Sequence, residues 1–121
     1  MGRNNLAGAW GEQLAASYLL KKRYTILATN YRCRYGELDI VAANKTHVVF
    51  VEVKLRKSAN FAAAAEFVDS HKQERLRITA DMYLSEYPTE LLSRFDVIEI
   101  YAPDGTQTAK PRINHLEDAF V

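Results

Sequence analysis

The amino-acid sequence predicts an α/β fold in which helices flank a mixed β-sheet, in the element order αβββαβ. Three observations support this prediction. Apolar residues recur at helix spacing near the N-terminus and again in the middle of the chain. Three segments of strand character lie between these two regions, and a fourth follows the second region. A tight turn joins the second and third strand segments, so a hairpin is expected to precede the second helix.

The first helix is expected over residues 5–22, where Leu6 and Trp10 begin the apolar repeat. Glu12 lies on a different stripe of this helix, among small residues such as Gly8. Because small residues let a helix approach its neighbour closely, we expect the Glu12 carboxylate to point towards that neighbour.

The later elements follow from strand composition and helix-capping signals. The strands are expected at residues 24–31, 37–43, 47–55 and 94–101, and helical spacing returns over residues 61–84. Asn44 and Lys45 are expected to form the tight turn, and Asp69 is expected to cap the longer part of the second helical region. The closing residues, 113–121, are expected to form a short strand and a last helical turn.

Composition is that of an ordinary globular chain. The 121 residues are 48% hydrophobic and 26% charged with a net charge of +1, which fits one domain over residues 1–121. Near-neutrality gives no evidence for a nucleic-acid partner, since such binding depends on local basic surface. Cys33 is the only cysteine, which excludes an intramolecular disulfide. No run approaches the roughly 18–20 apolar residues of a membrane span, so we expect a cytoplasmic protein with no membrane partner.

Charged residues interrupt two strands that are otherwise apolar. Because alternate residues of a strand share a face, Glu37 shares one with Asp39, and Glu52 shares one with Lys54. A two-residue turn would place Asp39 opposite Phe50 and Glu37 opposite Glu52. Asp39 and Glu52 would then be diagonal neighbours on one face of the sheet.

Two carboxylates placed as diagonal neighbours, with an ammonium group two residues further along the same strand, are typical of a site for a hard cation. Mg²⁺ takes oxygen ligands, often one or two carboxylates with waters and phosphate oxygens. We expect Asp39, Glu52 and the Val53 carbonyl to hold Mg²⁺ or Mn²⁺, and Lys54 to hold or polarise the attacking water. Glu12 would approach from the helix and complete this set. The alternative interpretation of the VEVK segment is a simple ion pair on one face of a strand.

The same residues resemble a known nuclease superfamily. Asp39, followed by Glu52 and Lys54 in the pattern ExK and preceded by a helix that carries Glu12, resembles the PD-(D/E)XK nucleases with their restriction-endonuclease-like fold. The arrangement is similar to that of archaeal Holliday-junction resolvases. Over nearly its full length the chain resembles the uncharacterised bacterial YraN-like family, in the segments GEQLAASYL, TNYRCRYGELDIVA, VVFVEVKLR, HKQERLRITADMYL, RFDVIEI and HLEDAF.

The resemblance implies that Glu12, Asp39, Glu52 and Lys54 form the metal and catalytic set of an endonuclease, with branched DNA among its substrates. Glu37 and Lys72 match family-typical polar positions, and Glu37 is expected to support the site from outside the set of metal ligands. One departure lies between VEVK and the next helix, where related sequences tend to have Gly and Pro. Here the chain reads NFAAAAEFV, and the alanines at 62–65 are expected to make this segment stiffer or more helical and so to alter substrate access.

Basic residues near the proposed site are expected to grip phosphates. They are Arg32, Arg34, Arg56, Lys57, Lys72 and Arg75. Solvated charge runs are the alternative interpretation of these residues. For the whole chain, the alternatives to an enzyme are a non-catalytic nucleic-acid-binding or adaptor protein that retains the nuclease fold, and a purely structural domain. A homodimer would give so small a nuclease more surface for gripping duplex, but the sequence leaves the oligomeric state open.

Overall fold

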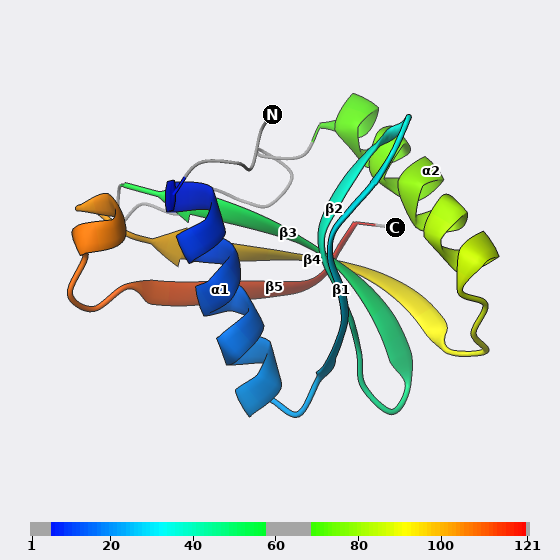
Figure 1. The fold of residues 1–121 in the computed structure, drawn as a ribbon, viewed down its shortest axis with the longest axis horizontal. Coiled ribbons are helices and arrows are strands. Elements are labelled where there is room, and N and C mark those ends of the chain that lie inside the picture. Colours follow the sequence, from blue (N-terminus) through cyan, green and yellow to red (C-terminus); the bar gives the residue numbers. More distant parts are fainter. Residues whose placement is uncertain (1–5, 58–68, 121) are drawn as a thin grey trace.

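A computed structural model describes residues 6–57 and 69–120 (Figure 1). In chain order the elements are α1 (Leu6–Lys21), β1 (Thr25–Cys33), β2 (Gly36–Ala43), β3 (His47–Arg56), α2 (Ser70–Glu86), β4 (Leu92–Tyr101), the short 3-10 turn η2 (Gly105–Gln107) and β5 (Arg112–Phe120). The predicted order αβββαβ is confirmed, with one further strand at the end. The Ala-rich segment singled out from the sequence lies outside the described residues, as does the first part of the second helical region.

The sheet is mixed, as predicted. Its strands lie in the order β1-β2-β3-β4-β5, with β3 and β4 parallel and the other neighbours antiparallel. α2 forms the crossover between the parallel pair, because parallel strands need a long connection. The result is an α/β fold compatible with a restriction-endonuclease-like architecture.

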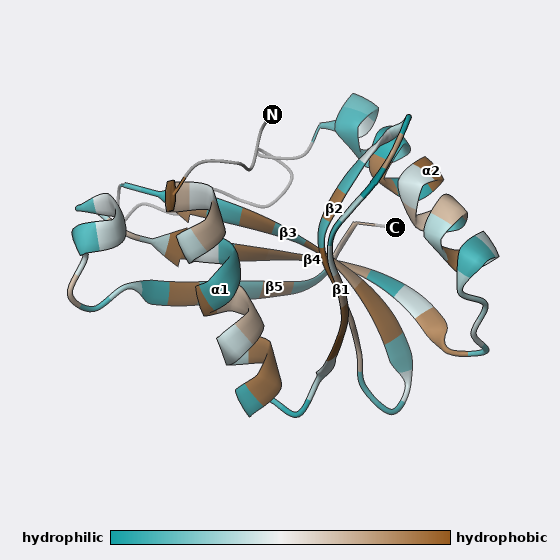
Figure 2. Cartoon of the chain, in the orientation of Figure 1, coloured by the Kyte–Doolittle hydropathy of each residue, from teal (hydrophilic) through white to brown (hydrophobic). Residues whose placement is uncertain are grey.

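The two helices cover opposite faces of this sheet. Val49, Val51 and Val53 of β3 pack in one apolar cluster with Ala15 of α1. The alternate residues Val48 and Phe50 pack with Leu76 and Tyr83 of α2. Since successive strand residues point to opposite faces, α1 and α2 cannot lie on the same side. Figure 2 shows the hydrophobic residues along the central strands that supply both clusters.

α1 lies unusually close to the sheet, as the small residues of its buried stripe predict. Gly8, Gly11 and Ala15 are buried on this stripe, and Glu12 is buried beside them. A Cβ atom at Gly11 would lie 3.0 Å from Leu55 Cδ2, tighter than ordinary packing allows. The sequence prediction for Glu12 is therefore correct in one respect, since this carboxylate faces the protein and not the solvent.

The tip of the β1–β2 hairpin leaves the plane of the sheet and lies beside α2 (Figure 1). Regular alternation would place Leu38 with Ile40 on the α1 side, but Leu38 packs in the α2 cluster. Asn30 has a φ of 53°, in the left-handed region, at this point of the neighbouring strand. The hairpin therefore bends between Ile40 and Leu38, which carries Asp39 to the point where β2 separates from β3.

Two sequence predictions need correction here. Val41 faces Phe50, so the β2–β3 register differs by two residues from the prediction that placed Asp39 opposite Phe50 and Glu37 opposite Glu52. The cause is the turn: the Asn44 side-chain oxygen accepts the N–H groups of Thr46 and His47, which makes a longer connection than a two-residue turn. A shift of two residues does not by itself move a side chain to the other face. Leu38 lies off its predicted face because of the bend, and not because of the register.

The second correction concerns the end of the chain. No helical turn follows the last strand within the described residues, because β5 continues to Phe120, which pairs with Phe95 of β4. Neither described helix is long and apolar enough to cross a membrane.

Candidate functional site

The carboxylate of Asp39 marks the centre of the charged cluster. Asp39 is 2% exposed, and its Oδ2 accepts the N–H of Val53 at 2.8 Å. The last β2–β3 pair is Ile40 with Val51. Beyond it the two strands separate, and the Asp39 side chain accepts a backbone N–H of β3 in place of a backbone carbonyl. The β2–β3 pairing therefore ends before Asp39, and the side chain of Asp39 reaches the residue that follows Glu52.

Glu52 lies between two lysines. It is 5% exposed, and its Oε2 lies 2.6 Å from Lys72 Nζ and 3.5 Å from Lys54 Nζ. Lys54 comes from the same strand, two residues along, whereas Lys72 comes from the first turn of α2. Both lysine side chains remain partly exposed, so this cluster is buried on its carboxylate side and open on its ammonium side.

The two lysines that contact Glu52 differ in the direction of their pKa shifts. Burial lowers the pKa of Lys54, and the nearby charge of Lys72 lowers it further, against the opposing effect of Glu52. Burial also acts to lower the pKa of Lys72, but the direct contact with Glu52 outweighs it, and the pKa of Lys72 is raised. Lys72 is thus the fixed cation of the pair, and Lys54 is the group that releases its proton more readily.

The start of α2 positions Lys72. Asp69 caps the helix by accepting the Lys72 N–H at 2.9 Å, as the sequence predicts. Leu76, one turn further on, packs against the sheet, so the helix stripe that begins at Lys72 faces the β2–β3 strands.

A hollow of about 250 Å³ continues the cluster along α2. Gly36, Glu37, Lys72 and Arg75 line it, together with Tyr35. Arg32 Nε lies 3.5 Å from Glu37 Oε2, and this ion pair holds Glu37 at the rim of the hollow. Two of the predicted phosphate-gripping residues, Lys72 and Arg75, therefore share one concave surface with the acids.

Glu12 approaches the cluster from the other side of the sheet. It lines a separate hollow of about 210 Å³ with Thr29 and Asn30 of β1. Thr29 pairs with Ile40, so Glu12 reaches the level of Asp39 but from the face that α1 covers. Within the described residues, no group of three or more His, Cys, Asp or Glu side chains is arranged to hold a metal ion.

The remaining predicted basic residues are spread more widely. Arg34 lies over the ring of Tyr35 at the hairpin tip, 5.1 Å from its centroid. Arg56 Nε lies 3.7 Å from Glu99 Oε2, and Lys57 is exposed beyond the end of β3.

Sequence reasoning missed two features of these faces. It expected Lys72 to bind phosphate and did not pair it with Glu52, although Lys72 Nζ lies closer to Glu52 than Lys54 Nζ does. The helix stripe from Lys72 through Leu76 could have indicated this, but the partner on the sheet could not be named without the fold. It also passed over Glu99, which is fully buried beside the end of β3 and accepts the side-chain N–H of Asn114 at 2.8 Å.

Comparison with known proteins gives a consistent result along nearly the whole chain. The model of the uncharacterised protein family UPF0102 matches residues 11–100. A UPF0102 protein of Syntrophomonas wolfei is 44% identical over 118 residues, which cover 97% of this chain and 99% of the relative. A UPF0102 protein of Caldanaerobacter subterraneus is 43% identical, covering 93% of each chain, and one of Rhodococcus opacus is 42% identical, covering 99% of this chain and all of the relative. The chain therefore belongs to the UPF0102 family, the YraN-like family that its sequence segments resemble.

Proposed function

We propose that this protein is a nuclease that hydrolyses phosphodiester bonds of nucleic acid with Mg²⁺ or Mn²⁺. The observation that carries the proposal lies where β2 separates from β3: Asp39 accepts the N–H of Val53, the residue between Glu52 and Lys54, and Glu52 contacts Lys54 and, from α2, Lys72. DNA, including branched DNA, is the proposed substrate, and the cytoplasm is the proposed location.

The donor set fits a hard cation. Asp39 and Glu52 supply carboxylate oxygens and Val53 supplies a backbone carbonyl, which are the ligand types that Mg²⁺ combines with waters and phosphate oxygens. In such a site the ion would polarise the scissile phosphate and lower the pKa of a bound water. The Val53 N–H donated to Asp39 fixes the orientation of this carboxylate, as outer contacts to metal ligands commonly do.

The lysines supply the charge that phosphate chemistry needs. Lys54 is placed to orient the attacking water, because its ammonium group lies on the open side of Glu52. Lys72, together with Arg75 in the adjoining hollow, is placed to hold phosphate oxygens of the substrate. Glu12 acts from the α1 side as a positioning residue for the Asp39 region, and Glu37 orients Arg32 at the rim.

A second candidate, a nucleic-acid-binding protein without catalysis, is favoured by one observation. The ammonium groups of Lys54 and Lys72 lie on the open side of Glu52 and Arg75 lines the adjoining hollow, so this surface would attract phosphate groups whether or not a metal ion takes part. A homodimer would extend the cationic surface in either case.

A substrate panel separates the two functions. Single-stranded, duplex, flapped and four-way DNA, and RNA, are incubated with Mg²⁺, Mn²⁺ or EDTA. The wild type is compared with Glu52→Gln and with the control Glu74→Gln, whose side chain is exposed on α2. Cleavage that needs the metal and disappears only in Glu52→Gln supports the nuclease. Salt-sensitive binding in EDTA, with no cleavage of any substrate, supports the second candidate and contradicts the first.

A further inference from the structure

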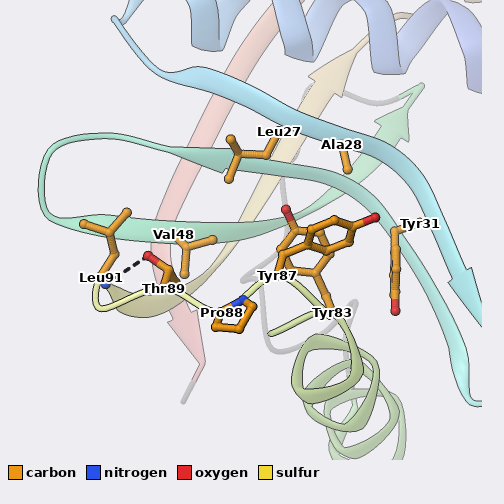
Figure 3. Close-up of a pocket in the computed structure, with 9 residues that line it drawn as sticks. All are labelled: Leu27, Ala28, Tyr31, Val48, Tyr83, Tyr87, Pro88, Thr89 and Leu91. Carbon is orange, nitrogen blue, oxygen red and sulfur yellow. Dashed lines mark hydrogen bonds between the residues drawn. The ribbon is translucent and has the colours of Figure 1, made fainter. Parts of the chain in front are cut away.

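A second concave site lies at the C-terminal end of α2, whereas Glu52 contacts Lys72 near the N-terminal end of this helix. Figure 3 shows the residues that line this second site. It is a pocket of about 390 Å³ between β1, β3 and the connection from α2 to β4. Tyr31, Tyr83 and Tyr87 form one wall, and Leu27, Pro88 and Leu91 contribute apolar surface. This volume is within the range of pockets that bind small ring systems.

The tyrosines form a supported aromatic surface. The rings of Tyr31 and Tyr83 meet edge to face at 5.3 Å between centroids, and those of Tyr83 and Tyr87 lie 4.8 Å apart at 35°. Tyr83 is 5% exposed and packs on Phe50 of the core, whereas Tyr87 is 57% exposed. The Tyr31 hydroxyl donates to Glu86, which holds that ring in place. A buried tyrosine thus supports an exposed one that is available for stacking.

The pocket and the cationic hollow lie along the same seam between α2 and the β1–β2 hairpin. Tyr31 contacts Tyr83 at one end of this seam, Cys33 lies beside Thr79 in the middle, and Gly36 lies beside Arg75 at the other end. Tyr83 and Arg75 are eight residues apart on α2, or about 12 Å along the helix axis. Single-strand-binding modules cover about 4–16 nucleotides, so one strand can occupy both places.

We propose that the tyrosine pocket binds an unpaired nucleobase of single-stranded nucleic acid, while Lys72 and Arg75 hold phosphates of the same strand. The part of this inference that concerns nucleic acid rests on the proposed function. Aromatic walls with hydroxyl groups at their edges suit the flat, polar-edged faces of bases, which stack on such surfaces whatever their sequence. The pocket lining itself carries no charge, whereas Lys72 and Arg75 line the hollow further along the same helix, where they can contact phosphates of the same strand. An apolar peptide side chain would use the pocket but would leave the cationic hollow unused.

The test measures binding without cleavage. Fluorescence anisotropy in EDTA compares labelled oligothymidine, a blunt duplex, and the same duplex with a single-stranded tail. The variants are Tyr87→Ala, Tyr87→Phe and the control Leu20→Ala. Leu20 has a similar exposure, 56%, on the helix that covers the other face of the sheet. Because Tyr87 is exposed, its replacement is expected to leave the fold intact.

Tyr87→Ala is expected to weaken binding of oligothymidine and of the tailed duplex by about 5- to 150-fold, the usual effect of losing one base–aromatic stack. Tyr87→Phe, which keeps the ring, and Leu20→Ala are expected to bind like the wild type. Binding of the blunt duplex is expected to be the same in all four proteins. Equal affinities of wild type and Tyr87→Ala for oligothymidine would overturn the inference, as would an equal loss on blunt duplex.

The outcome is independent of catalysis. If no substrate is cleaved in Mn²⁺ but Tyr87→Ala still loses single-strand binding, the pocket assignment stands and the nuclease proposal fails. If DNA is cleaved normally and Tyr87→Ala binds all three ligands like the wild type, the nuclease stands and the pocket assignment fails.

Discussion

Glu52 and Lys54 on β3, and Arg94 and Asp96 on β4, are the same local pattern on neighbouring parallel strands: opposite charges two residues apart on one face. Their surroundings differ. Asp96 Oδ1 accepts from Arg94 Nε at 2.9 Å and from the Asp118 N–H at 3.0 Å, while Oδ2 accepts from Arg94 Nη2 at 2.9 Å and from His115 Nε2 at 2.7 Å. Glu52 instead meets two partly exposed lysines through one oxygen.

The difference separates a structural network from a candidate site. The donors of Asp96 are themselves held, since Arg94 also donates to the Tyr24 hydroxyl and His115 contacts the Tyr18 hydroxyl. These hydrogen bonds connect α1, β4 and β5 in the interior of the protein. In the Glu52 cluster, by contrast, the two ammonium groups are partly exposed, so a ligand can reach them. The Asp96 network is closed off from solvent, whereas the lysines on Glu52 remain partly exposed.

Removing Asp96 is expected to have the largest effect on stability. Asp96→Ala leaves Arg94 and His115 without their acceptor and is expected to lower the free energy of unfolding by about 3–5 kcal/mol. Urea denaturation measures the loss, and Asp81→Ala, at an exposed position on α2, is the control with a change within about 0.5 kcal/mol. A loss below about 1 kcal/mol for Asp96→Ala would mean that the two regions do not differ as described.

Metal binding is expected to depend on Asp39, in the charged cluster with Glu52. Asp39→Asn retains an oxygen that accepts the Val53 N–H, so the loss of stability is expected to be about 1 kcal/mol. The affinity of the Asp39→Asn variant for Mn²⁺, measured by calorimetry, is expected to be more than 10–100-fold lower than that of the wild type. A loss of 10–100-fold is typical of mutating residues that only support the metal ligands. Unchanged Mn²⁺ affinity beside a normal Asp81→Asn control would remove Asp39 from the ligand set.

Acid is expected to weaken the Asp96 network. Burial acts to raise the pKa of Asp96, but hydrogen bonds from His115 and Arg94 outweigh it, so the pKa is lowered. A lowered folded-state pKa adds stability that is present above the unfolded value, about 3.9, and is lost as the pH falls through the folded value. The difference in unfolding free energy between wild type and Asp96→Asn is therefore expected to be constant near neutral pH and to shrink below about pH 4. A difference that grows with acid would reverse the assigned sign.

Lys72→Ala is expected to have the smallest effect on stability, at most about 1 kcal/mol, because its ion pair is partly exposed. Its effect on nucleic-acid binding is specific. The slope of log affinity against log salt is expected to fall by about 0.7–0.9, the contribution of one phosphate contact. Lys45→Ala, exposed in the β2–β3 turn, is expected to leave the slope unchanged. An unchanged slope in Lys72→Ala would indicate that this lysine serves Glu52 alone.

Strand alternation made much of the candidate site predictable. The common face of Glu52 and Lys54 follows from a period of two within one strand. Asp39 reaches the neighbouring Val53 N–H at the bend of β2, which alternation alone does not predict. The exact register was not predictable, because Asn44 extends the turn by accepting two backbone N–H groups with its side chain. The last strand was only partly predicted, since pairing with β4 stabilises an extended conformation that the local sequence does not specify.

The distinction between the two charged pairs was not predictable from local sequence. VEVK and RFD both place opposite charges two residues apart in an apolar strand. Only the fold supplies the second partners: Lys72 from α2 for Glu52, and His115 from β5 for Asp96. The position of Glu12 on the α1 side likewise depends on which face each helix covers.

Metal-dependent cleavage by Lys54→Ala tests the central claim most directly. The rate of DNA cleavage in Mn²⁺ is compared among the wild type, Lys54→Ala and Lys45→Ala, after circular dichroism has shown that all three are equally folded. A water-orienting role predicts that Lys54→Ala loses about 10²–10⁴-fold in rate while Lys45→Ala matches the wild type. Equal cleavage by all three proteins would contradict the assignment of the Glu52 cluster as a catalytic site.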